Sequence, residues 1–98
     1  MDENQDNSQQ VAKDEHSSRL ASIKSRAVKE LVAIMPQTDE FNAERRFDIY
    51  ISAIRSSGDV DSAENALNAA LEIEDQGLRA SALSELIDEV QYLEIKNV

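Results

Sequence analysis

Three carboxylates near the C-terminus, Glu85, Asp88 and Glu89, are spaced so that they share one face of a helix. Paired carboxylates act as general acid and base when one of them is buried, because desolvation favours its neutral form. These three positions lie off the apolar stripe of their segment, so we expect water to surround them. The spacing therefore favours a charged outer face over a catalytic site.

The best match to a calcium-binding loop is the segment DVDSAENALNAALE, which begins at Asp59. Such a loop needs oxygen ligands at alternating positions, glycine at the sixth and glutamate at the twelfth. The fifth, sixth and twelfth positions here hold Ala63, Glu64 and Ala70. These mismatches leave a helix N-terminus as the better explanation of Asp59 and Asp61, and we expect no bound metal.

Nucleophilic catalysis has little support in the residue types of this chain. His16 is the only histidine and lies in a polar segment, whereas a Ser–His–Asp arrangement needs its histidine held in a cleft. Two glycines are too few for a Gly-rich phosphate-binding loop. The absence of cysteine excludes disulfides and thiolate metal sites. We therefore expect a protein that is not an enzyme and needs no cofactor.

The formal net charge of −10 is unevenly distributed along the chain. Residues 1–56 carry ten acids and eight bases, whereas residues 57–98 carry ten acids and two bases. Much of this acidity serves solubility, and it argues against direct binding of nucleic acid or an anionic membrane. The first predicted helix is locally basic, with Arg19, Lys24, Arg26 and Lys29. One hypothesis is that the acidic C-terminal half matches this basic segment within the same molecule.

Apolar residues recur at helical spacing from about residue 17 onward, whereas the residues before it are polar. We therefore predict an all-α fold, with a disordered tail over residues 1–16 and one helical domain over residues 17–98. The helices are expected at about 17–35, 39–56, 61–74 and 78–93. Their short connections imply antiparallel neighbours, so the helices form either a compact four-helix bundle or stacked helical hairpins.

The residues expected to be buried form an apolar stripe on each helix. The first stripe comprises Leu20, Ile23, Ala27, Leu31 and Ile34, with Val28, Val32 and Met35 beside it. The second comprises Phe47, Tyr50, Ile51 and Ile54. The third helix is rich in alanine (Ala63, Ala66, Ala69 and Ala70) and also carries Leu67, Leu71 and Ile73. Small side chains let a neighbouring helix approach closely. The fourth stripe comprises Leu83, Leu86, Val90 and Leu93, and Ala82 and Ile87 widen it.

Several residues mark where these helices begin and end. Pro36 ends the first helix, because proline disfavours the α conformation in the residue before it. Thr38 is placed to cap the second helix, and Gly58 to stop it in a left-handed conformation. Asp61 and Glu64 have the spacing of a capping box at the start of the third helix.

Residues 47–75 carry small and large residues in a further pattern. The turn and small positions, with the residue that follows them, are Gly58, Asp59, Ala63, Ala70 and Leu71. The large positions are Phe47, Tyr50, Ile54 and Leu67. This segment resembles one helical hairpin of the tetratricopeptide type, which implies two antiparallel helices that bind a peptide or protein. Ile51 and Asp75 depart from the pattern, since the family usually has a small residue and a proline there.

The distribution of apolar residues also bears on the compartment. The N-terminal segment has no apolar run typical of a signal peptide. The longest apolar run elsewhere spans residues 31–35, whereas a bilayer span needs about 20 residues. We expect no membrane association and a cytoplasmic location.

These observations favour a protein–protein interaction module with an acidic, partly apolar surface, whose partner has a basic surface. The residues predicted to bind the partner are Glu72, Glu85, Asp88, Glu89 and Tyr92. One alternative is a structural homodimer in which Leu86, Val90 and Leu93 pack against a second copy. The other is an inhibitor whose acidic surface imitates nucleic acid.

Overall fold

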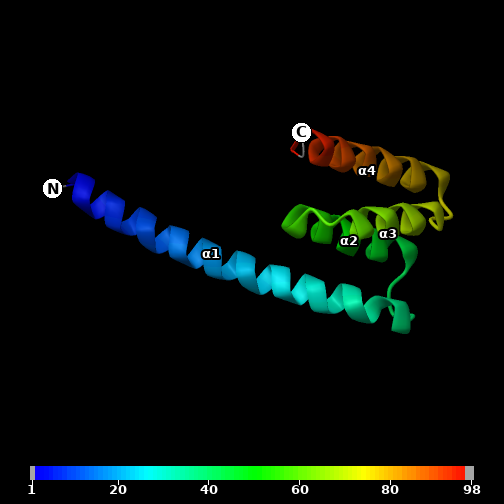
Figure 1. The fold of residues 1–98 in the computed structure, drawn as a ribbon, viewed down its shortest axis with the longest axis horizontal. Helices are drawn as coiled ribbons and strands as arrows, with labels where there is room; N and C mark the ends of the chain where they lie inside the picture. Colours follow the sequence, from blue (N-terminus) through cyan, green and yellow to red (C-terminus); the bar gives the residue numbers. More distant parts are fainter. Residues whose placement is uncertain (1, 97–98) are drawn as a thin grey trace.

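The computed structural model describes the backbone of residues 2–96 and the side chains of residues 14–96. Its elements are α1 (Asp2–Ile34), the short 3-10 helix η1 (Met35–Gln37), α2 (Ala43–Ser57), α3 (Val60–Leu71) and α4 (Gln76–Lys96). The antiparallel hairpin of α2 and α3 lies in the middle, with α4 on one side and α1 on the other (Figure 1). The prediction of an all-α fold with four helices is confirmed.

The start of α2 differs from the sequence prediction. Asn42 has an extended backbone and its side-chain oxygen accepts a hydrogen bond from the Arg45 amide at 2.8 Å, so Asn42 is the N-cap. The predicted cap, Thr38, instead accepts from the Glu40 amide at 3.3 Å in the connection after η1. The predicted start at residue 39 is wrong, because Asn42 offers the better-placed acceptor. Pro36 lies in η1, directly after α1 ends.

The turn between α2 and α3 is built by two adjacent residues. Gly58 has a φ of +68° and its amide donates to the Ile54 carbonyl at 2.7 Å, which confirms the predicted left-handed stop. Asp59 caps α3, since its carboxylate accepts from the Asp61 amide and from the Ser62 hydroxyl. The capping box predicted for Asp61 is therefore wrong, and the cap lies two residues earlier.

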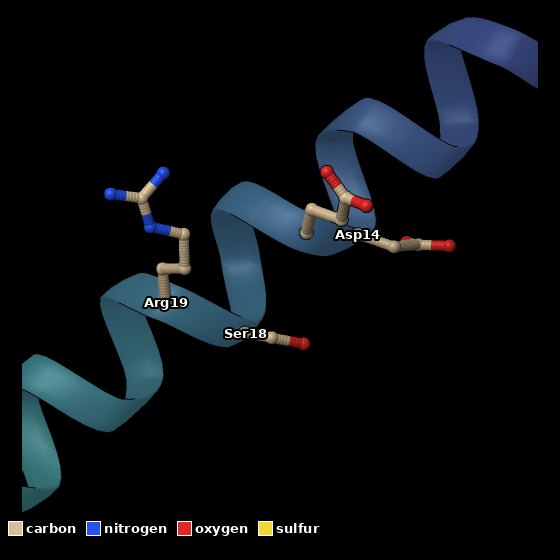
Figure 2. Close-up of a pocket in the computed structure, with 4 residues that line it drawn as sticks. Asp14, Ser18 and Arg19 are labelled. Carbon is tan, nitrogen blue, oxygen red and sulfur yellow. The ribbon is translucent and has the colours of Figure 1, made fainter.

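Most of α1 is not covered by the rest of the protein. The helix is continuous through Asp14 and His16, which the sequence analysis assigned to a disordered tail, and residues 1–13 of that tail lie outside the side chains described here. Side chains 14–24 are all exposed, and Figure 2 shows Ser18 and Arg19 pointing away from the helix on different sides. The structure thus places this stretch of α1 in contact with solvent.

The predicted buried stripe of α1 is largely wrong. Leu20 and Ile23 are 66% and 61% exposed, and Ile34 is exposed as well. Of the residues predicted for this stripe and its side, those that pack against the core are Leu31, Val32 and Met35. α2 packs against α1 only near the C-terminal end of α1. The buried side of α1 is therefore the side that α2 covers, and not the side with the most regular apolar spacing.

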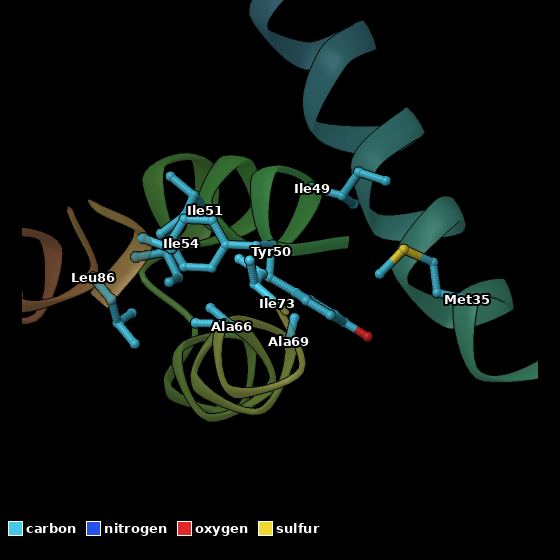
Figure 3. Close-up of a cluster of buried hydrophobic side chains, with 12 residues drawn as sticks. Met35, Ile49, Tyr50, Ile51, Ile54, Ala66, Ala69, Ile73 and Leu86 are labelled. Atoms are coloured by element: carbon cyan, nitrogen blue, oxygen red, sulfur yellow. The ribbon is translucent and has the colours of Figure 1, made fainter. Parts of the chain in front are cut away.

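The core lies where α2, α3 and α4 meet, and its predicted α2 members are confirmed. Phe47, Tyr50, Ile51 and Ile54 are all buried, and Figure 3 shows the last three with Ala66 of α3 and Leu86 of α4. The alanines of α3 allow the close helix approach that the sequence predicts, because Ala66, Ala69 and Ala70 are almost completely buried. Ile49 and Ala53 are also buried, although no stripe predicted them; Ile49 points toward α1 (Figure 3).

Candidate interaction surface

Three of the five residues predicted to bind a partner are engaged within the chain. Arg46 of α2 pairs with Glu72 at the end of α3. Arg55, also on α2, pairs with Glu89 at 2.6 Å and with Glu85 at 3.2 Å, both on α4. The structure thus uses these acids to join α3 and α4 to α2.

The ion pairs of Arg55 lie at the edge of the core. The hydrogen bond that Glu89 accepts raises the pKa of the Arg55 guanidinium. The Glu89 side chain is only 16% exposed, whereas the Arg55 side chain is 58% exposed, so water screens the pair from one side. These contacts fix which side of α4 faces α2.

The two remaining predicted residues, Asp88 and Tyr92, are exposed on α4. Asp88 makes no ion pair within residues 14–96. Tyr92 lines a small cleft beside Arg55 and Glu89 at the end of α4. The structure therefore leaves these two side chains accessible, but does not gather the five predicted residues into one site.

A second surface, which the sequence analysis did not identify, lies on the other side of α4. Glu85 and Glu89 face α2. Ile87 lies on nearly the opposite side of α4 from both residues, so it faces away from α2. Ile87 is 58% exposed, and its helix neighbours Leu83 and Val90 are half-buried against the core. This side of α4 is therefore apolar and only partly covered.

α3 contributes an apolar side to the same surface. Leu67 and Leu71 are one turn apart and are 40% and 54% exposed, and Val60 lies two turns before Leu67 on that side. Ser62, on the opposite side of α3, lines a cleft with residues of α1, so Leu67 and Leu71 face away from α1. Since α4 packs on α3 from the side away from α1, the uncovered sides of the two helices adjoin.

We call this surface the α3–α4 face. Its exposed members are Val60, Glu64, Leu67, Leu71, Ile87 and Glu94, with Leu83 and Val90 at its base. Glu64 and Glu94 border the apolar residues, and neither makes an ion pair with another side chain among residues 14–96. The α3–α4 face could have been predicted from the spacing of Val60, Leu67 and Leu71. These residues share one side of their helix, and the alanine-rich stripe that forms the core occupies another.

The cleft between α1 and the α2–α3 turn has a volume of about 440 Å³ and is rich in hydroxyl groups. Three of its four serine hydroxyls are already used: Ser56 and Ser57 donate to the Ala53 carbonyl, and Ser62 donates to Asp59. No histidine lines the cleft, so no serine there has a histidine base. The cleft is the space left between α1 and the α2–α3 turn, and its side chains do not have the arrangement of a catalytic site.

The stripe proposed for a homodimer is largely occupied within the chain. Leu86 is buried in the core, and Val90 and Leu93 pack against it. Leu93 also lies against the α2–α3 turn, where its Cδ2 atom is 3.5 Å from the position that a Cβ on Gly58 would take. A second copy could therefore not use this stripe without displacing the core.

Among the side chains described, no group of three or more His, Asp or Glu residues is placed to hold a metal ion. Over the same part of the chain, no helix has the length and apolar character that a membrane span requires. Comparison of the chain with protein-family models, curated proteins and solved structures finds no match.

Proposed function

We propose that this chain is a non-enzymatic protein–protein interaction module whose α3–α4 face binds a basic, amphipathic helix of a partner. The observation that carries the proposal is the strip of uncovered apolar side chains along two adjoining helices, bordered by carboxylates. An apolar strip of this kind favours a helix that presents apolar residues at three- and four-residue spacing. The carboxylates favour lysine or arginine beside those residues.

The arrangement of the helices supports the same proposal. In stacked helical hairpins each hairpin covers one face of its neighbour, and the last face in the stack stays uncovered. Here α4 covers α2 and part of α3, while the outer sides of α3 and α4 stay open. The α3–α4 face is thus the position at which a further helix would pack. The resemblance of residues 47–75 to a tetratricopeptide hairpin agrees with a role in binding peptides or proteins.

The size of the surface sets the affinity that we expect. Complete burial of an exposed Leu or Ile contributes about 1.5–3 kcal/mol, and Leu67, Leu71 and Ile87 are already half covered. Association and the ordering of side chains offset part of that gain. We therefore expect micromolar binding, in which charge sets the orientation of the partner and the rate of association.

The test is a binding titration of the full chain with a synthetic helical peptide of about 18 residues that carries leucine on one face and lysine on the other. We expect E64K/E94K to weaken binding by about tenfold or more, since two attractions become repulsions. The control D39K/E40K makes the same change of charge outside the face and should bind like the wild type. Equal affinity of all three proteins for the peptide would show that the α3–α4 face is not the binding surface.

A further inference from the structure

The exposed part of α1 carries an apolar stripe that nothing in the described chain covers. The stripe consists of Leu20, Ile23, Ala27 and Ile34, all exposed and spaced to share one side of the helix. An isolated helix is marginally stable in water, and most helices in proteins are stabilised by packing of their apolar face. Residues 14–27 therefore present an amphipathic helix without a partner for its apolar side.

The same part of α1 is basic, and its charge is not matched by an ion pair among residues 14–96. Arg19, Lys24 and Arg26 flank the apolar stripe, and residues 17–29 contain no acid. Every ion pair found within residues 14–96 joins α2 to α3 or α4, and none involves α1. The hypothesis that the acidic C-terminal half matches this segment finds no support among residues 14–96, because no ion pair joins α1 to residues 57–98. Lys29 and Asp59 line one cleft without forming such a pair, and the α2–α3 hairpin separates α1 from α4 (Figure 1).

We propose that α1 of one copy binds the α3–α4 face of a second copy. The inference rests on the function proposed above, since it names a second copy of this chain as the source of the basic, amphipathic helix. The α1 stripe and the α3–α4 face both have exposed apolar side chains. Arg19, Lys24 and Arg26 carry the charge opposite to that of Glu64 and Glu94.

The dimensions of the two surfaces agree. The α1 stripe from Leu20 to Ile34 is about 21 Å long at 1.5 Å per residue, and the α3–α4 face extends about 17 Å along residues 83–94 of α4. All of α4, with 21 residues, is about 32 Å long. The stripe can therefore lie along most of α4 beside α3. If both copies contribute their α1, two equivalent contacts form and the assembly closes as a symmetric dimer.

Charge also distinguishes this arrangement from the alternative symmetric ones. Pairing α1 with α1 would bring Arg19, Lys24 and Arg26 of one copy close to the same residues of the other. Pairing two α3–α4 faces would likewise bring Glu64 and Glu94 close to their own copies. Only the contact between α1 and the α3–α4 face places opposite charges beside the apolar residues.

The test is the molar mass in solution, measured by light scattering at micromolar and sub-millimolar concentration and at two salt levels. The two variants are K24E/R26E on α1 and E64K/E94K on the α3–α4 face, with D39K/E40K as the control. We expect the wild type and the control to approach twice the monomer mass of 10.9 kDa. Each variant alone should remain a monomer, because α1 and the α3–α4 face then carry the same charge.

An equimolar mixture of the two variants provides the decisive observation. In the mixture each α1 meets an α3–α4 face of opposite charge, so we expect the dimer mass to return. Dimers formed by either variant alone, or a wild type that stays monomeric at sub-millimolar concentration, would overturn the inference. Circular dichroism of each variant should show unchanged helix content, so that loss of association is not loss of folding.

The peptide titration separates this inference from the function on which it rests. A monomeric wild type that binds the basic peptide through the α3–α4 face would overturn the second-copy inference and support the proposed function. A monomeric wild type that does not bind the peptide would overturn both. A dimer that the peptide dissociates would support both, since the peptide and α1 then compete for one surface.

Discussion

α2 and the exposed part of α1 are both amphipathic helices, but they differ in how many neighbours cover them. α2 packs against α1, α3 and α4, and six of its residues are buried. Residues 14–24 of α1 have no buried or half-buried side chain. The comparison shows that an apolar stripe becomes core only where other elements are placed to cover it. We propose that the stripe that stays uncovered on α1 is a surface for contact with another copy of the chain.

Truncation of a core side chain should give the largest difference between the two helices. Phe47 is 3% exposed, so Phe47→Ala should lower the free energy of unfolding by about 3–5 kcal/mol through lost burial and a cavity. Leu20→Ala on α1 should change it by less than about 0.5 kcal/mol in dilute protein. Urea unfolding followed by circular dichroism measures both. Equal losses would show that α1 is packed as tightly as α2.

Enlarging a small residue sharpens the same comparison. Ala66 is fully buried where α2 and α3 approach each other, so Ala66→Leu should cost about 1–3 kcal/mol of stability by overpacking. The matched change Ala27→Leu lies on the exposed stripe of α1 and should not destabilise the dilute protein. Thermal unfolding of the two variants measures the change in stability that each substitution causes. A destabilised Ala27→Leu variant would contradict the exposure of that stripe.

The stripe of α2 was predictable because Phe47, Tyr50 and Ile54 fall on one side of a helix that neighbours surround. The stripe of α1 has similar spacing, but local periodicity does not show that α2 meets only the C-terminal part of α1, from about Ser25 to Met35. The α3–α4 face escaped prediction for a related reason. Leu67 and Leu71 look like core residues, and only the packing of α4 shows that they remain uncovered.

The contacts of the charged residues were also beyond what the sequence could predict. The acidity of the C-terminal half was evident from the sequence, but the engagement of Glu72 and Glu89 was not. Their partners, Arg46 and Arg55, lie 26 and 34 residues away in the chain, and such pairs depend on the tertiary arrangement. The N-caps of α2 and α3 were missed by four and two residues, because several Asp, Asn and Thr side chains compete near each start.

Loss of the cap of α3 should have a smaller effect than the core changes. Asp59→Ala removes the acceptor for the Asp61 amide and for the Ser62 hydroxyl, and should cost about 1 kcal/mol. Asp61→Ala removes an exposed carboxylate from the first turn and should cost less, because no hydrogen bond to its side chain is formed within the described residues. Chemical unfolding of the pair tests the assignment. A larger loss for Asp61→Ala would restore Asp61 as the cap.

The smallest effect is expected at the ion pairs between α2 and α4. Arg55→Ala removes both contacts to Glu85 and Glu89, but the arginine side chain is 58% exposed. We therefore expect a loss of about 0.2–1 kcal/mol, which should shrink as salt is added. Unfolding at two salt concentrations checks this. A loss that is large and independent of salt would mean that Arg55 contributes through packing instead.

Hydrogen exchange along α1 tests the central claim, that its exposed stripe binds the α3–α4 face of another copy. We predict that amides of residues 17–27 in the wild type become more protected as protein concentration rises, while those of α2 stay protected throughout. E64K/E94K should abolish the concentration-dependent protection in α1 and leave that in α2 unchanged. Protection of residues 17–27 that is independent of both concentration and the variant would contradict the account.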